Sequence, residues 1–233
     1  MRLLTGGLLT IALFWVAVGP AADAPATGTI SGVVRFTGVV PKPEIITTSD
    51  GGRLEHYDLV VDGKTQGLRS VFVQLEDAPA QAKVEKAEPV LMDQRDMIFL
   101  PRVVAVRHGQ AVRFDNNDLC NHSVQAVSTV AANQFNRFVL PAQPIDHVFE
   151  LQKKPVVIGC SLHSWMRAWV YVVPHPWFAI TDRDGKFTIP KVPTGKYTLT
   201  AHHPDTGLQD RQTVQVESGK TAEVTVEWKK TGR

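Results

Sequence analysis

The sequence predicts an all-β protein built from two β-sandwiches, and three observations support this prediction. Short runs rich in Val, Ile, Phe, Tyr and Thr recur between Gly, Pro and Asp turn signals, as in "GTISGVVRF", "SVFVQL" and "AWVYVV". No long stretch shows the periodicity of an amphipathic helix. Regular short strands separated by turns at this spacing are typical of sandwiches.

The first segment in chain order is an apolar run from Leu8 to Val18, which follows Arg2 and precedes the small-residue stretch "GPAADAPA". This order is typical of a cleaved export signal, so we expect residues 1–22 to be a signal peptide. An uncleaved anchor is the alternative, but the run is shorter than the roughly 20 apolar residues that span a bilayer. The sequence therefore predicts a periplasmic or otherwise exported protein with no stable membrane insertion after cleavage.

The overall charge argues against one class of partner. The chain has 25 basic and 23 acidic residues, and loss of Arg2 with the signal peptide leaves 24 basic residues and a net charge of +1. Proteins that bind nucleic acid or anionic membrane surfaces do so through concentrated basic charge. The sequence therefore predicts neither kind of partner.

Residues 176–229 carry the signals of a small sandwich. The stretch "AITDRDGKFTIPKVPTGKYTLTAHH" alternates strands with turns at Asp184-Gly185 and at Pro193 to Gly195, and "QTVQV", "ESGK" and "TAEVTVEW" add a hairpin. This pattern resembles the carboxypeptidase regulatory-like family, a transthyretin-like sandwich in which D-x-x-G-x-F-x-I and P-x-G-x-Y-x-L are common. The resemblance implies two earlier strands, and residues 27–77 supply matches to them in "GTISGVVRF" and "SVFVQL".

About a hundred residues separate these two parts of the regulatory-like sandwich. Insertion of a domain at an exposed loop costs little free energy. We therefore expect residues 89–175 to form a second domain inserted into the first, with residues 78–88 as a linker. The alternative is two domains in a row, with residues 27–77 belonging to the first of them.

The inserted part places three soft donor groups in one short loop, "GCSLHSWM", which contains Cys160, His163 and Met166. In the strand before this loop, Val156, Ile158 and Cys160 share one face, so the thiolate is expected at the edge of the core. Two imidazoles and a thiolate in a plane, with a weak axial thioether, hold copper so that both Cu(I) and Cu(II) are tolerated. The second imidazole has to come from a neighbouring strand.

Together with "DMIFLPRVVAVRHGQAVRFDNND", "NHSV" and "AWVYVV", this loop resembles the cupredoxin family of small blue copper proteins, and its C-x-x-H-x-x-M spacing is like that of amicyanin. The resemblance implies a Greek-key sandwich with one type 1 copper site. Its ligands would be the Cys160 thiolate, the His122 and His163 imidazoles and, in the axial position, the Met166 thioether. The chain departs from the family at Ser123, where an Asn commonly ties the two ligand loops together.

Cys120 offers a competing interpretation, because it lies two residues before His122. An exported protein with two cysteines often pairs them, and a disulfide between Cys120 and Cys160 would remove the thiolate ligand. Zinc or an empty site are further alternatives, although Met is a poor ligand for zinc. We also expect Ser123, Trp165 and Cys120 to contact the ligands or to form part of a docking surface, with core packing as the alternative for Trp165.

The remaining histidines are expected to be ordinary polar residues. His202 and His203 are adjacent, and adjacent residues of a strand point to opposite faces, so the two imidazoles cannot easily chelate one metal ion. We therefore predict that both are loop or surface residues.

These features favour an electron carrier that is not an enzyme. Copper enzymes such as multicopper oxidases need further copper sites, usually with H-x-H pairs, and no H-x-H sequence occurs here. The alternative is an exported binding or structural protein whose cupredoxin-like domain lacks a working copper site.

The whole chain also resembles exported bacterial methylamine-utilisation or plastocyanin-like proteins. The sequence contains no C-x-x-C-H motif for haem attachment. We therefore expect a separate redox partner, such as a c-type cytochrome or a periplasmic dehydrogenase.

Overall fold

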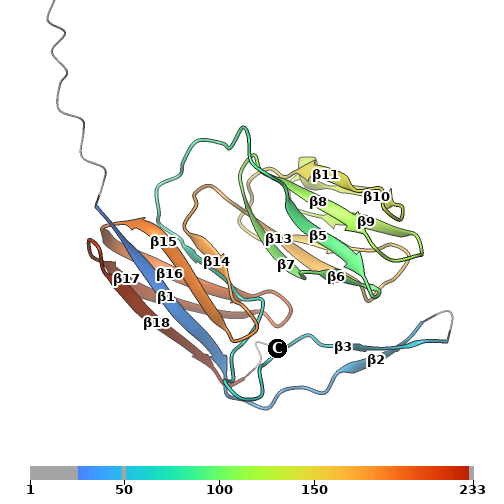
Figure 1. Cartoon of the computed structure of the whole chain (residues 1–233), viewed down its shortest axis with the longest axis horizontal. Coiled ribbons are helices and arrows are strands. Elements are labelled where there is room, and N and C mark those ends of the chain that lie inside the picture. The colour runs from blue at the N-terminus through green and yellow to red at the C-terminus, as the bar shows by residue number, and fades with distance from the viewer. Residues whose placement is uncertain (1–25, 49–50, 231–233) are drawn as a thin grey trace, which may run out of the picture.

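The computed structural model describes residues 26–48 and 51–230, so the expected signal peptide at residues 1–22 lies outside the described residues (Figure 1). Within these ranges the chain forms strands and a single short 3-10 turn, η1 (Ala131–Asn133), which confirms the all-β prediction. No helix in this part of the chain is long and apolar enough to cross a membrane.

One sandwich combines strands from both ends of the chain. Its two sheets have the strand orders β15-β1-β18 and β14-β4-β16-β17. The strands are β1 (Thr27–Phe36), β4 (Phe72–Leu75), β14 (Phe178–Ile180), β15 (Lys186–Pro193), β16 (Gly195–His203), β17 (Leu208–Val216) and β18 (Thr221–Trp228). The blue strand β1 lies between the orange β15 and the red-brown β18, antiparallel to the first and parallel to the second (Figure 1).

Period-two patterning builds the core of this first sandwich. Alternate residues of β1, such as Ile30 and Val34, are completely buried against side chains of the opposing sheet. The turn before β15 requires glycine at Gly185, because its φ is +76° and a Cβ there would lie 2.3 Å from the Val34 carbonyl oxygen. The turn residues therefore fix how β15 pairs with β1.

The second sandwich is built from the middle of the chain. Its sheets have the orders β10-β9-β12-β13-β7 and β11-β8-β5-β6. The strands are β5 (Val90–Arg95), β6 (Ile98–Leu100), β7 (Val103–Arg107), β8 (Ala111–Asn116), β9 (His122–Val127), β10 (Phe135–Val139), β11 (Ile145–Val148), β12 (Val156–Gly159) and β13 (Arg167–Val173). A core that includes Phe99, Phe114 and Phe149 fills the space between the sheets.

Strand β13 is buried on both faces, and this joins the two sandwiches. Ala168, Val170 and Val172 point into the core of the second sandwich. Trp169 and Tyr171 point the other way, into a separate buried cluster. In that cluster the Tyr171 ring stacks on Phe72 of β4, with ring centroids 3.9 Å apart. The outer face of the second sandwich therefore packs directly on the first.

An ion pair between a partly exposed arginine and a buried aspartate joins the two sandwiches. The Arg102 guanidinium, just before β7, lies 2.7 Å from the Asp205 carboxylate in the β16–β17 loop. The same guanidinium lies 5.4 Å from the centre of the Trp169 ring. A charge-assisted hydrogen bond at this position holds the two sandwiches in register.

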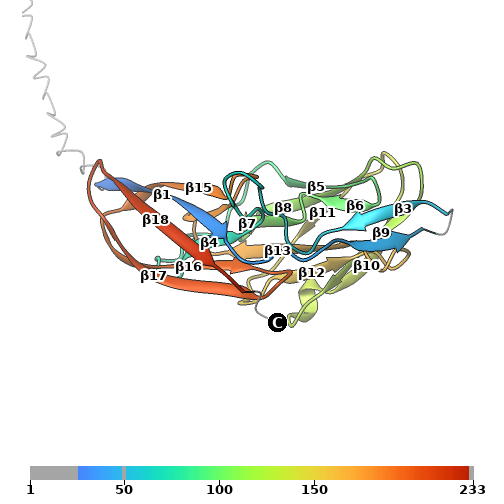
Figure 2. The ribbon, with the colours of Figure 1, turned by 90° about the horizontal axis from the view of Figure 1, so that it is seen from below.

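A two-stranded hairpin, β2 (Glu44–Thr47) and β3 (Arg53–His56), stands apart from both sandwiches. In the two ribbon views the hairpin extends along the second sandwich (Figures 1 and 2). His56 at the end of β3 lines a small cavity together with Ile98 and Leu100 of β6. The hairpin base therefore contacts the domain that carries the expected ligands.

The prediction that His202 and His203 are loop or surface residues is wrong. Both lie on β16, and His203 is 1% exposed, with its Nδ1 2.9 Å from the Thr206 hydroxyl. The Tyr171 hydroxyl lies 2.6 Å from Nδ1 of His202. Burial lowers the pKa of both imidazoles, that of His203 to about 3. Contact between the sandwiches buries this strand end, which the local sequence does not reveal.

Candidate metal centre

Three of the four expected ligands meet at one end of the second sandwich. His122 begins β9, and Cys160 directly follows β12, which pairs antiparallel with β9. His163 lies in the loop after Cys160. The two Nδ1 atoms of His122 and His163 are 3.0 Å apart, and the Cys160 Sγ lies 3.9 Å from the first and 3.7 Å from the second. The strand pairing therefore brings residues about 40 positions apart to one point.

The size of this triangle suits a metal ion. With these three sides, the point equidistant from the donor atoms lies about 2.1 Å from each of them. Metal–nitrogen and metal–sulfur bonds to such side chains are roughly 2.0–2.3 Å long. The three donors can therefore bind one ion close to their common plane without rearrangement.

The fourth expected ligand, Met166, is buried in the same core cluster as Cys160 and is 1% exposed. Two turn hydrogen bonds fold the loop between them: the His163 N–H donates to the Cys160 carbonyl at 3.3 Å, and the Met166 N–H donates to the His163 carbonyl at 3.0 Å. The loop is closed where the Cys160 N–H donates to the Met166 carbonyl at 3.3 Å. These hydrogen bonds hold the backbone of Met166 close to that of Cys160.

Ser123 joins the two ligand segments. Its hydroxyl accepts a hydrogen bond from the Ser161 N–H at 2.8 Å and lies 2.8 Å from the Ser161 hydroxyl. Its backbone N–H donates to the Cys160 sulfur at 3.3 Å. The shorter side chain thus makes the cross-loop contacts that the sequence resemblance assigns to an asparagine.

The Cys160 thiol is acidic in this environment. Burial would raise its pKa, but hydrogen bonds from His122 and from the Ser123 N–H outweigh burial and lower the pKa to about 6. For His122, burial lowers the pKa, while hydrogen bonds to Cys160 and Asp118 raise it by more, so the net shift is upward. At neutral pH the sulfur is therefore largely a thiolate, the form that binds metal.

Metal binding to the metal-free protein is expected to weaken first as the pH falls through the raised pKa of His122, above 6.5, and more steeply below about 6, the pKa of Cys160. Because the pKa of Cys160 is below its ordinary value, protons compete for the sulfur only near and below that pH. Each displaced proton should cost about tenfold in apparent affinity per pH unit, and His122 adds a second proton. Competition titrations from about pH 5 to pH 8 measure this. If the apparent affinity already began to decrease at about pH 8.5, the ordinary cysteine pKa, the lowered pKa of Cys160 would be contradicted.

Asp118 is a site residue that the sequence interpretation missed. One of its carboxylate oxygens lies 2.8 Å from Nε2 of His122. The same carboxylate accepts hydrogen bonds from the N–H groups of Asp96 and Met97 at 2.7 and 3.0 Å. An acidic residue four positions before the histidine was visible in the sequence, but nothing local indicated that the two side chains meet. A carboxylate on the far nitrogen orients a ligating imidazole and raises its basicity.

Replacing Asp118 by asparagine is expected to lower Cu(II) affinity by roughly 10–100-fold. The reduction potential should rise, because loss of the carboxylate makes the imidazole a weaker donor to Cu(II). Competition titration and redox potentiometry measure the two effects. Asp146→Asn is the matched control, since that carboxylate is exposed and pairs with Arg113 on the same domain. Equal Cu(II) affinities and equal reduction potentials in the two variants would show that Asp118 does not act on the site.

The other two residues expected near the ligands, Trp165 and Cys120, both contact Met97. The Trp165 ring lies 5.2 Å from the His163 ring, half-buried, and its Nε1 donates to the Met97 carbonyl at 3.1 Å. The Cys120 Sγ lies 3.6 Å from Nε2 of His122, on the far side of the imidazole from Cys160. Among the described residues no disulfide joins the two cysteines.

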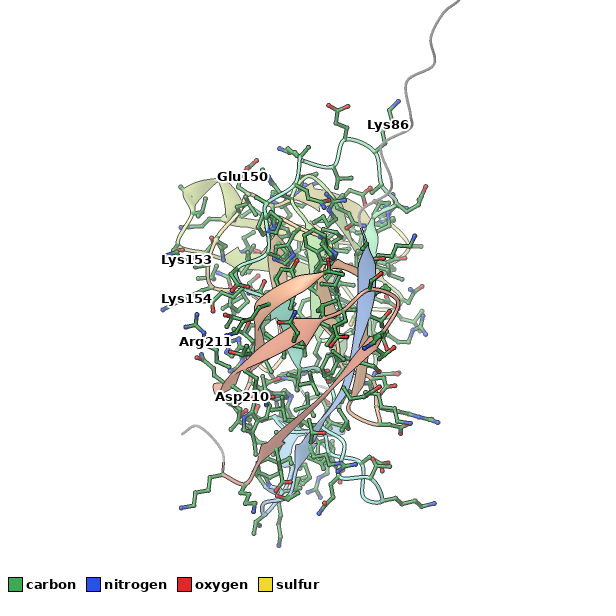
Figure 3. All side chains as sticks on the ribbon, turned by 90° about the vertical axis from the view of Figure 1, so that its left-hand side faces the viewer. Lys86, Glu150, Lys153, Lys154, Asp210 and Arg211 are labelled. Atoms are coloured by element: carbon green, nitrogen blue, oxygen red, sulfur yellow. The ribbon has the colours of Figure 1, made fainter. Side chains whose placement is uncertain are left out.

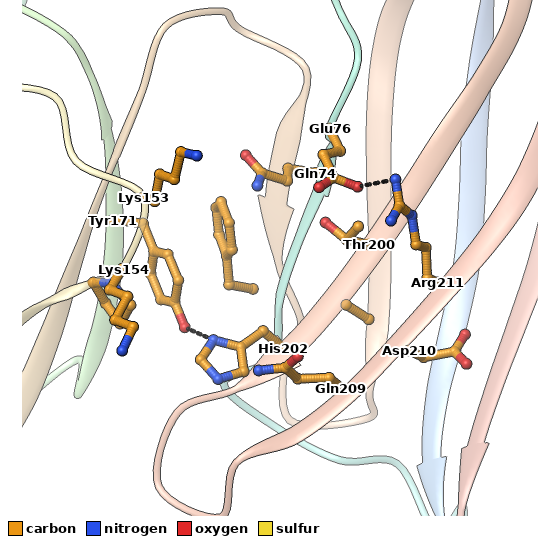
Figure 4. A pocket seen from close by; sticks show the side chains of 13 residues that line it. Gln74, Glu76, Lys153, Lys154, Tyr171, Thr200, His202, Gln209, Asp210 and Arg211 are labelled. Carbon is orange, nitrogen blue, oxygen red and sulfur yellow. Dashed lines mark hydrogen bonds and ion pairs between the residues drawn. The ribbon is translucent and has the colours of Figure 1, made fainter.

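A separate groove of about 490 Å³ lies between the sandwiches. Figure 3 shows Lys153, Lys154 and Arg211 on the face that borders it. In Figure 4, Arg211 pairs with Glu76 at 2.8 Å. The groove therefore presents mixed charge, and the potential metal-binding groups found in the described residues lie elsewhere, at the end of the second sandwich.

Several solved structures are similar to parts of the chain. A copper-containing nitrite reductase from Thermus scotoductus is 20% identical over 41% of this chain and 25% of its own length, with a TM-score of 0.35. A purple cupredoxin from Nitrosopumilus maritimus is 21% identical over 36% of this chain and 99% of its own, with a TM-score of 0.31. Amicyanin from Paracoccus versutus is 20% identical over 43% of this chain and 97% of its own, with a TM-score of 0.33.

No curated protein matches the sequence. A family model does match its C-terminal part. The match begins within β13, which packs in the second sandwich, and continues beyond the end of β18. The resemblance inferred from the turn pattern is thus confirmed there: residues 168–229 match the carboxypeptidase regulatory-like domain.

Proposed function

We propose that the protein is an exported type 1 copper protein that carries single electrons between redox partners. The observation that carries this proposal is the triangle formed by Cys160 Sγ and the two Nδ1 atoms of His122 and His163, whose size suits one metal ion. Met166, buried in the same core cluster as Cys160, would complete the set as the axial thioether. Copper in such a set exchanges one electron with little change in geometry.

The surroundings of the ligands favour a rigid site. The His122 side chain is completely buried and is fixed at both nitrogens by neighbouring groups. Ser123 ties the segment of His122 to the segment of Cys160. Because His122 and the segment of Cys160 are held before any metal binds, a change of oxidation state would require little movement there.

We infer that partners approach over His163. This imidazole is partly exposed, and the neighbouring loops present exposed apolar side chains at Leu119 and Leu162. Apolar residues around a partly exposed ligand suit short-lived docking of a redox protein, such as a c-type cytochrome or a periplasmic dehydrogenase. The regulatory-like sandwich would serve as a docking or tethering element, and the second sandwich would be a domain inserted into it.

The donor set favours a carrier over an enzyme. The described residues offer one compact triangle of two imidazoles and a thiolate, and the sequence contains no H-x-H pair for further copper sites. The alternative function is an exported binding or structural protein in which the copper site does not work. The state of the two thiols distinguishes these possibilities.

The test is the visible absorption spectrum of the mature protein after addition of Cu(II), with a thiol count on the denatured, metal-free protein. We expect an intense thiolate-to-Cu(II) band at about 600 nm and both Cys120 and Cys160 as reactive thiols. A colourless protein without reactive thiols would mean that the two cysteines are bridged. That outcome would overturn the electron-carrier proposal and favour the binding protein.

A further inference from the structure

A second group of soft donors lies on the opposite side of His122 from the candidate copper ligands. The Cys120 Sγ lies 3.6 Å from Nε2 of His122 and 3.7 Å from the Met97 Sδ. Donor atoms of Asp118, Cys120 and His122 all lie within 4.8 Å of one another. One imidazole therefore separates two groups of potential ligands, with Nδ1 facing Cys160 and Nε2 facing Cys120.

Met97 is held in place by several contacts. It lies in the tight turn between β5 and β6, where Asp96 and Met97 have φ values of +55° and +62°. Asp118 accepts hydrogen bonds from the backbone N–H groups of both residues, and the Met97 carbonyl accepts one from the Trp165 indole. A left-handed turn of two non-glycine residues needs such support, and here the support keeps the Met97 sulfur beside Cys120.

The chemistry of this outer group selects one kind of ion. A thiolate and a thioether prefer Cu(I) to hard cations such as Mg²⁺ or Ca²⁺, and the thioether disfavours Zn²⁺. The Asp118 carboxylate adds a negative charge 2.8 Å from Nε2 of His122. Cys120 is exposed to solvent while Cys160 is 5% exposed, so the outer group is the more accessible of the two.

We propose that Met97, Cys120 and Nε2 of His122 form a capture site for Cu(I), which then passes to the inner group across the shared imidazole. The capture step does not depend on the proposed function, whereas the transfer step rests on it. On capture the Cys120 thiol gives its proton to solvent, and the imidazole proton moves from Nε2 to Nδ1. On transfer Cys120 regains a proton from solvent, the imidazole proton returns from Nδ1 to Nε2, and the Cys160 thiolate receives the ion. Copper remains Cu(I) throughout, so no oxidant or reductant is consumed.

The test removes the inner thiolate and measures the outer group alone. The full-length mature chain carrying Cys160→Ser is titrated with Cu(I) against a coloured Cu(I) chelator, under argon with a non-thiol reductant. We expect one Cu(I) to bind, with affinity at least about tenfold lower when Cys120→Ser or Met97→Leu is added. Adding Leu91→Ser, an exposed change on β5, the strand that leads into the Met97 turn, is the matched control and should leave the Cu(I) affinity unchanged. Equal binding by all four proteins would overturn the proposal.

A second measurement uses the unaltered protein and does not depend on how the variants fold. The rate at which iodoacetamide alkylates Cys120, read by peptide mass spectrometry, is compared with and without one equivalent of Ag(I), a redox-inert substitute for Cu(I). With the inner group first filled by one equivalent of Cu(I), we expect one equivalent of Ag(I) to protect Cys120 at least about tenfold. In that state Nδ1 is already a ligand, so the Nε2 proton and the Cys120 proton are both released to solvent. Unchanged alkylation would reject the capture site. If Cu(II) gives no blue band while Ag(I) still protects Cys120 from alkylation, the proposed function is rejected and the capture site stands.

Discussion

Replacing Cys160 by serine is expected to abolish the absorption band at about 600 nm, because that band arises from charge transfer between the thiolate and Cu(II). Affinity for Cu(II) should fall by more than the roughly 10–100-fold that follows loss of a group outside the ligand set. The hydroxyl of serine is not ionised near neutral pH, so it cannot replace the thiolate, whose pKa is about 6. Absorption spectra and competition titration of the purified variant measure both effects.

A control on the same strand separates loss of the ligand from damage to β12. Val157 lies on the outer face of this strand and is 37% exposed, while Ile158 and Cys160 are buried. Val157→Ser should therefore keep the blue band. A blue Cys160→Ser protein would show that the sulfur does not bind copper and would remove the basis of the electron-carrier assignment.

Replacing Met166 by glutamine is expected to keep copper bound but to lower its reduction potential. An amide oxygen is a stronger axial donor to Cu(II) than a thioether, so the oxidised state gains more. We expect a shift of at least about 59 mV, which corresponds to a tenfold change in the preference between the oxidation states for one electron. Redox potentiometry of the copper-loaded protein measures the shift.

Two methionine-to-leucine variants complete this experiment. Met166→Leu removes the axial donor without adding another and should raise the potential. Met92→Leu, at a completely buried position of the same core, should leave the potential unchanged. The metal-free Met166→Gln protein should also be less stable, because its buried amide would lack a partner. Equal potentials in the two Met166 variants would exclude this residue from the site.

The local part of the site was predictable from the sequence. Cys160, His163 and Met166 lie within one loop, so their spacing alone brings them together once the chain turns. His122 was assigned through the resemblance to cupredoxins, and the structure places it at the start of β9, which pairs antiparallel with β12. The turn at Gly185 and the alternation in β1 likewise predicted strands of a sandwich.

The contacts that surround the ligands were not predictable in the same way. Asp118 and Met97 meet His122 and Cys120 only because the tight β5–β6 turn packs against the loop before β9. The strand end at His202 and His203 lies against the other sandwich, where Tyr171 contacts His202 and Arg102 pairs with Asp205. The local sequence does not indicate these contacts.

The sequence by itself determined the all-β class and the spacing of the ligand loop, since strand periodicity and loop spacing are properties of neighbouring residues. Only the tertiary structure showed that both faces of β13 are buried and that Asp118 contacts His122. It also showed that a second donor group lies on the Nε2 side of the His122 imidazole. The physical reason is that segments far apart in the chain hold these groups in place, such as the β5–β6 turn, whose Asp96 and Met97 contact Asp118 and Cys120. The free energy of such contacts appears only when the sheets pack, so no local pattern encodes them.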